Sequence, residues 1–204
     1  MHKVLDFIKK NKQFSFFLLL VILLALITIF APVIAPQDPY VSDLKNALQP
    51  PSSDHWFGTD KLGRDIFSRV IYASRSSLPA TLILVALIFV IGTLLGTLAG
   101  YFGGWIDAVI MRISDMMISF PGMVLAIAVA GIMGASVKNA VIAVAVVSWP
   151  KYARLARSLV MKIRHEDYIY AAIVTGSKTS YILRKYMLPN IIPTLIITAA
   201  TDIG

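Results

Sequence analysis

Long stretches without a single charged residue are the feature that most constrains this chain. Four of them, residues 13–37, 76–106, 116–137 and 186–201, contain no Asp, Glu, Lys or Arg. A run of about 20 apolar residues matches the hydrocarbon core of a bilayer, which is roughly 30 Å thick. Only 15% of the 204 residues are charged, whereas a soluble domain has about a quarter. The sequence therefore predicts an all-α, polytopic integral membrane protein.

The formal net charge of +8 could indicate a nucleic-acid partner. The excess Lys and Arg, however, lie beside the apolar runs, where the positive-inside rule already accounts for them. We therefore expect contact with membrane lipid and no nucleic acid. The chain has no cysteine, which excludes disulfides and thiolate metal sites.

A basic segment precedes the first apolar run, which extends over residues 14–30. A signal peptide is the alternative, but the run is long and no clear small-residue cleavage site precedes Pro32. We expect residues 1–35 to form a retained transmembrane helix with a cytoplasmic tail. The predicted N-terminus is thus on the cytoplasmic side of the membrane.

Residues 36–75 are rich in proline and contain five acidic and five basic residues. This balance, against the basic N-terminus, predicts an extracytoplasmic segment. Near its end Ile66, Val70 and Ile71 recur at helical spacing, which predicts a short helix on the membrane surface.

Residues 76–204 are expected to form a membrane core that includes a cytoplasmic loop at 151–188. Its first span, residues 78–100, has Gly92, Gly96 and Gly100 four residues apart, a stripe that favours close helix packing over any ligand role. Pro121 and Gly122 interrupt the next apolar segment and predict a kink or break. Such a break can line a pathway, but it is more often a bend accommodated by packing.

A further span is predicted at residues 137–152, after which Lys151, Arg154 and Arg157 are expected to reach the cytoplasmic face. Counting crossings places residues 151–188 in the cytoplasm. Eight Lys or Arg residues against two acidic ones in this segment indicate the same side. Within it, residues 164–189 predict a helix, a bend at Gly176, a second short helix and a stop at Pro189.

A fifth span begins at Pro189, but about 16 residues reach only roughly 24 Å, short of a comfortable crossing. The chain is therefore expected to be cut off inside this helix. Asp202 is unfavourable in lipid unless protein buries it.

Segment 170–189 resembles the cytoplasmic loop of bacterial ABC-importer permeases. The family pattern is Glu-Ala-Ala, three residues, Gly, nine residues, an apolar residue, one residue, Leu-Pro. Tyr186 stands at the apolar position and Tyr170 where the family often has Glu. The remaining pattern is matched by Ala171, Ala172, Gly176, Leu188 and Pro189. The segment FGTDKLGRDIFSRVIYASRSSL is similar to the outer segment of the second permease subunit in dipeptide, oligopeptide and nickel importers.

The resemblance implies six transmembrane helices, so this chain would be a fragment of a permease or a truncated one. It also implies a homologous second permease, two ABC ATPase subunits that bind ATP and Mg, and an extracytoplasmic solute-binding protein. The loop residues Tyr170, Ala171, Ala172, Gly176, Leu188 and Pro189 would then couple the chain to an ATPase. The solute remains open among dipeptide, oligopeptide, nickel and opine.

No catalytic, cofactor or metal site is evident in the sequence, because no phosphate loop is present and His2, His55 and His165 are scattered. We expect a non-catalytic subunit. Two other classes stay open: a membrane-embedded enzyme, which the uncharged spans disfavour, and a structural or assembly protein without an ATPase partner.

Overall fold

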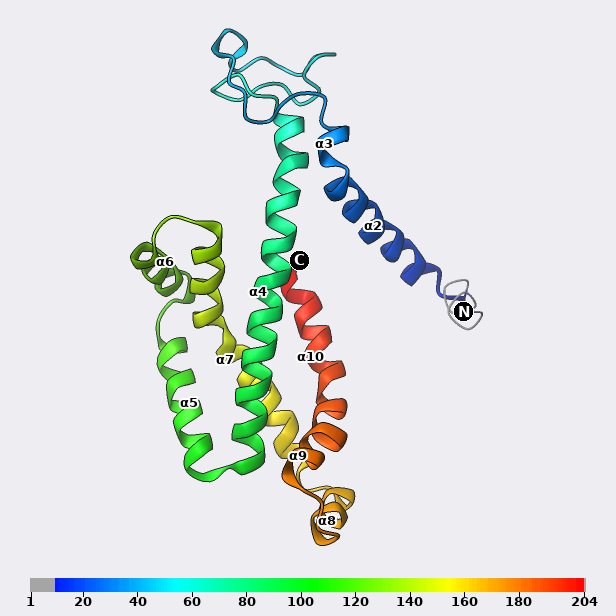
Figure 1. Ribbon diagram of the computed structural model, residues 1–204, viewed down its shortest axis with the longest axis vertical. Helices are drawn as coiled ribbons and strands as arrows, with labels where there is room; N and C mark the ends of the chain where they lie inside the picture. Colours follow the sequence, from blue (N-terminus) through cyan, green and yellow to red (C-terminus); the bar gives the residue numbers. More distant parts are fainter. Residues whose placement is uncertain (1–9, 204) are drawn as a thin grey trace. The chain divides into compact units, whose positions relative to one another are not determined.

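A computed structural model describes residues 10–203, so most of the predicted cytoplasmic tail lies outside the described residues. The chain divides into two compact units, residues 1–79 and 80–204, and the boundary falls at Pro79 inside helix α4. The described residues form helices and, apart from one isolated bridge between Thr59 and Asp65, no β-structure. This agrees with the predicted all-α class (Figure 1).

The first unit begins with α2 (Lys12–Ile29), which confirms the predicted apolar helix, and the short α3 (Ala31–Ile34). None of the residues of α2 is buried. A helix that is apolar on all sides and uncovered by protein is suited to a lipid environment. The chain then continues through an irregular segment that contains one 3₁₀ turn, η1 (Leu44–Asn46).

Two aspartates organise the irregular segment before α4 (Ile66–Phe102). Asp60 accepts hydrogen bonds from the backbone N–H groups of Leu62 and Arg64 and forms ion pairs with Arg64 and Arg69. Desolvation opposes ionisation of Asp60, but these hydrogen bonds outweigh it and lower its pKa to about 2. Asp65 accepts from the N–H of Ser68 at 2.7 Å and thus caps the start of α4.

Helix α4 differs from the prediction of a separate surface helix followed by a span from residue 78. One continuous helix of 37 residues includes both parts. Pro79 lies inside it and removes a single backbone donor. Long helical segments on both sides keep the chain helical through this position, as is common for proline in membrane helices.

In the second unit, α5 (Gly104–Ser119) and α6 (Gly122–Met133) meet at an angle of 93°. This confirms the predicted break at Pro121. The next helix, α7 (Val137–Ile163), continues through Pro150 for 27 residues. Only its first half is apolar, and α7 by itself is not among the helices that are long and apolar enough to cross a membrane.

The end of the chain forms α8 (Asp167–Val174), α9 (Thr179–Ile182), the π-helical turn η2 (Leu183–Met187) and α10 (Leu188–Ile203). The predicted bend at Gly176 is present, but the predicted stop at Pro189 is wrong. Pro189 is the second residue of α10, and the helical segment continues through it to Ile203. The π turn before it allows the N–H of Leu188 to reach the carbonyl of Leu183, five residues back.

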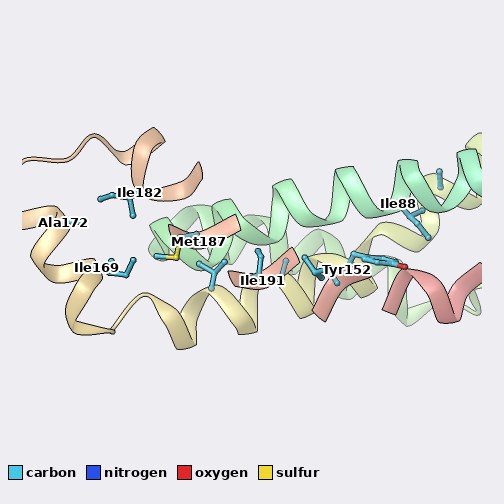
Figure 2. Packing of buried hydrophobic residues seen from close by; sticks show 11 residues of the cluster. Ile88, Tyr152, Ile169, Ala172, Ile182, Met187 and Ile191 are labelled. Atoms are coloured by element: carbon cyan, nitrogen blue, oxygen red, sulfur yellow. The ribbon is translucent and has the colours of Figure 1, made fainter. Parts of the chain in front are cut away.

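A buried apolar cluster runs through the second unit. Ile169 and Ala172 of α8 lie at one end of it, Met187 and Ile191 in the middle, and Ile88 and Tyr152 at the other end (Figure 2). The core of α7 and α10 is therefore continuous with the inner side of α8.

By length and composition, three described helices could cross a membrane: α2, α4 and the combined segment 179–203. The bent pair α5–α6 makes a fourth if it counts as one span. These helices support the predicted polytopic membrane protein.

Candidate coupling loop

Helix α8 lies at the end of the second unit (Figure 1) and is the centre of the candidate site. It has two different faces. Ile169 and Ala172 are buried in the cluster, whereas Tyr170, Ile173 and Val174 are exposed, Val174 by 85%. Ala171 is exposed as well. Of the two predicted docking alanines, Ala171 is thus on the free surface and Ala172 packs within the chain.

Gly176 ends α8 in a tight turn. Its φ of +80° lies in the left-handed region that glycine adopts without strain. The N–H of Gly176 donates to the carbonyl of Ile173, and the N–H of Ser177 donates to that of Ala172. This pair of bonds is a Schellman motif, which uses glycine at this position. A Cβ on Gly176 would meet no atom within 4 Å, so the glycine serves the turn and leaves an open surface.

Tyrosines hold the two arms of the loop together. The ring of Tyr186, on η2, lies 6.0 Å from the ring of Tyr168 on α8 and 6.0 Å from that of Tyr181 on α9. Tyr170 lies outside this group, and its hydroxyl oxygen is 2.9 Å from Nδ1 of His165. Leu188 is half-buried and Pro189 exposed, at the start of α10. The residues of the predicted motif therefore form one connected hairpin.

The glycine stripe of α4 faces α7, and the backbones of the two helices are in close contact there. A Cβ at Gly92 would lie 2.5 Å from Cβ of Tyr152, and one at Gly96 would lie 2.8 Å from Cα of Ala153. At Gly100 it would lie 2.8 Å from the carbonyl oxygen of Arg157. Real Cβ contacts are longer than these, so each glycine permits a separation of α4 and α7 that alanine would not.

The basic residues of α7 pair with acidic residues of neighbouring helices, and the side chains of Lys151 and Arg154 also remain exposed. Arg157 forms a bidentate pair with Asp107 of α5 at 2.5 and 2.6 Å. Arg154 pairs with Asp115 of the same helix at 2.5 Å. Lys151 pairs instead with Asp202 of α10. Their spacing of three residues was visible in the sequence, but their partners, 39 to 51 residues away, were not.

A pocket of about 420 Å³ lies between α6 and α7. Small and apolar side chains dominate its lining, which includes Gly122, Ala126, Ala130, Ala140 and Ser148. Side chains within the described part of the chain therefore do not fill the space beside the break at Pro121.

Residues 92–204 match the family model described as "binding-protein-dependent transport system inner membrane component". Residues 2–51 match the N-terminal TM domain of oligopeptide transport permease C. The chain belongs to the family of inner-membrane components of binding-protein-dependent transport systems. The family resemblance that the loop motif predicted is therefore confirmed.

Several curated permeases are similar to this family member over most of its length. The dipeptide transport system permease protein DppC of Alkalihalophilus pseudofirmus is 43% identical over 97% of this chain and 65% of the relative. The probable D,D-dipeptide transport system permease protein DdpC of Escherichia coli K12 is 45% identical over 91% of this chain and 62% of the relative. The nickel transport system permease protein NikC of the same strain is 37% identical over 92% and 68%. The chain thus spans less than two thirds of the length of the first two relatives.

Proposed function

We propose that the chain is the second permease subunit of an ATP-driven importer for a small peptide, nickel or a related small solute. It forms the solute pathway with a homologous permease and receives solute from an extracytoplasmic binding protein. ATP and Mg bind to two ABC ATPase subunits, one of which contacts the loop at 164–189. The names of the relatives, which include dipeptide and nickel permeases, support the range of solutes.

The observation that best supports this proposal is that α8 has two different faces. An outward apolar face of Tyr170, Ala171, Ile173 and Val174 provides a surface for a partner, and such exposed apolar groups mark interaction sites. The inward face of Ile169 and Ala172 belongs to the core that α7 and α10 share. A close-packed core transmits displacement instead of absorbing it. A partner that moves α8 therefore moves the membrane helices.

The proposal also fixes a topology. The N-terminus and the loop at 164–189 lie in the cytoplasm, and the segment at 36–65 lies outside. Gly100 packs against Arg157, and α7 stays helical to Ile163, so the cytoplasmic boundary is nearer Arg164 than Lys151. The uncovered side of α6, beside the pocket at Gly122, is available to the pathway and the second permease.

The topology is tested by labelling, because the chain has no cysteine of its own. Single cysteines replace Val174 in α8 and Val41 in the predicted outer segment, both of which are exposed. In intact cells a membrane-impermeant thiol reagent should modify Val41→Cys and leave Val174→Cys unmodified until the membrane is opened. Labelling of Val174→Cys in intact cells would refute the cytoplasmic loop.

Docking is tested by Val174→Asp, which adds a charge to the outward face of α8 without touching the core. We expect the amount of ATPase subunit that copurifies with the complex to fall at least about tenfold, as when an interface anchor is lost. Val41→Asp is the matched control at a similarly exposed valine, and it should retain the ATPase. Equal retention by both variants would exclude this face as the docking surface.

A further inference from the structure

Asp202 is the one acidic residue after Asp167, and it follows the charge-free run 186–201 on the last turn of α10. Its carboxylate contacts two groups of α7. Lys151 Nζ lies 2.5 Å from Oδ1, and the hydroxyl of Tyr152 donates to Oδ2 at 2.8 Å. The Asp202 side chain is only 21% exposed. The carboxylate is thus partly enclosed and has both a cation and a donor.

The Lys151 side chain is 58% exposed in this chain, but the position of these groups along the helices places them within apolar segments. Trp149 and Tyr152 pack against Gly92, which lies inside the charge-free segment 76–106. Gly92 precedes the end of α4 at Phe102 by ten residues, or about 15 Å of helix. Asp202 is likewise 14 residues, or about 21 Å, from the start of α10. Ionisable groups at this depth in a membrane span are expensive unless paired, and they mark functional positions.

The basic residues near this pair are already engaged elsewhere. Arg154 and Arg157 follow Lys151 on α7, but both form ion pairs with carboxylates of α5. Lys151 is therefore the cation that holds Asp202. Helix α7 is joined to α5 through one set of charges and to α10 through another.

At its opposite end, α10 is attached to α7 and α8 by apolar packing. Met187 and Ile191 share the buried cluster with Val160 of α7 and with Ile169 of α8 (Figure 2). Helices α7 and α10 are thus in contact along the apolar cluster, which also includes Tyr152 and Leu195, and the contacts of Lys151 and Tyr152 with Asp202 add a polar connection at the far end. Apolar packing is non-directional, whereas an ion pair and a hydrogen bond favour one rotation and one offset of the two helices.

We infer that Lys151, Tyr152 and Asp202 form a latch that makes α7, α8 and α10 a single lever for the movement of the coupling loop. These three are positioning residues, because they act on the helices and not on the solute. The inference rests on the proposed function. Without the latch, ATPase subunits still bind α8, but α10 no longer follows α7 and solute transport separates from ATP hydrolysis.

The test uses the full complex, with its partner permease, ATPase subunits and binding protein, reconstituted in proteoliposomes. The variants are Lys151→Met, Asp202→Asn and the exchanged pair Lys151→Asp with Asp202→Lys. Uptake and ATP hydrolysis are measured in the same vesicles with the solute that the binding protein carries. Each single variant should lower the solute transported per ATP at least about fivefold while retaining its ATPase subunits, and the exchanged pair should recover most of that ratio.

A merely structural pair would lower uptake and hydrolysis in proportion, and that result would overturn the latch. So would an exchanged pair that inserts normally but stays uncoupled. If the single variants fail to insert, the exchanged pair alone decides between these results. Failure of the proposed function would give a different result, because the unsubstituted complex would then contain no ATPase subunits. In that case the thermal stability of the variants in detergent would still report whether Lys151 and Asp202 join α7 to α10.

Discussion

The contact between α4 and α7 makes a sharp prediction at Gly96. A Cβ at this position would lie 2.8 Å from both Cα and the carbonyl carbon of Ala153, so an alanine meets backbone that cannot rotate away. Overpacking of a tight contact costs about 1–3 kcal/mol, and a site between two helix backbones belongs in the upper half of that range. The higher helix propensity of alanine offsets up to about 1 kcal/mol of this cost. The expected net loss for Gly96→Ala is therefore about 2 kcal/mol.

Gly131 in α6 supplies the matched control. It is exposed, lies inside a helix, and a Cβ there would meet no atom within 4 Å. Gly131→Ala should therefore keep the propensity gain and stabilise the protein by up to about 1 kcal/mol. Both changes add the same methyl group, so their difference isolates the contact with α7.

The assay is thermal unfolding of the purified protein in detergent. A loss of about 2 kcal/mol corresponds to a fall in Tm of roughly 4–8 °C for a chain of this size. Gly96→Ala should show this fall, and Gly131→Ala should show no fall or a small rise. If the two variants unfold at the same temperature, α4 and α7 are not in backbone contact and the role of the glycine stripe is refuted.

Two further predictions concern charged groups. The pKa of Asp60 is lowered from 3.8 to about 2, so its contribution to stability is complete above pH 4 and is lost as the pH falls from about 4 to 2. The difference in fluorescence between the protein and its Trp56→Phe variant should report that loss, and Asp60→Asn should remove the part of the pH dependence in this window that Asp60 contributes. The bidentate pair of Arg157 with Asp107 predicts that Arg157→Lys destabilises the protein by about 1 kcal/mol or more, because lysine keeps the charge but cannot donate two parallel hydrogen bonds to the carboxylate. A double-mutant cycle with alanine at both positions should give a coupling of roughly 0.5–3 kcal/mol, and a coupling of zero would show that the pair does not form.

Local signals in the sequence were sufficient for several elements. The apolar run at 14–30 becomes α2, Pro121 breaks the helix that contains it, and Gly176 ends α8. Each of these features depends on a few consecutive residues. The solubility of a segment in lipid depends on a run of apolar side chains. A proline or a glycine in the left-handed region changes the backbone conformation at its own position. Nothing distant is needed to decide them.

Other features were settled only by tertiary packing. The sequence could not show that α4 continues through Pro79, or that a π turn carries the helix past Pro189. It gave Asp202 no partner, although Lys151 and Tyr152 bind it. Such a partner depends on the rotation and vertical offset of two helices, which the periodicity of either helix leaves free. The sequence by itself determined the apolar helix at 14–30, the break at Pro121 and the bend at Gly176, and the packing of α4, α7 and α10 decided which charged residues meet.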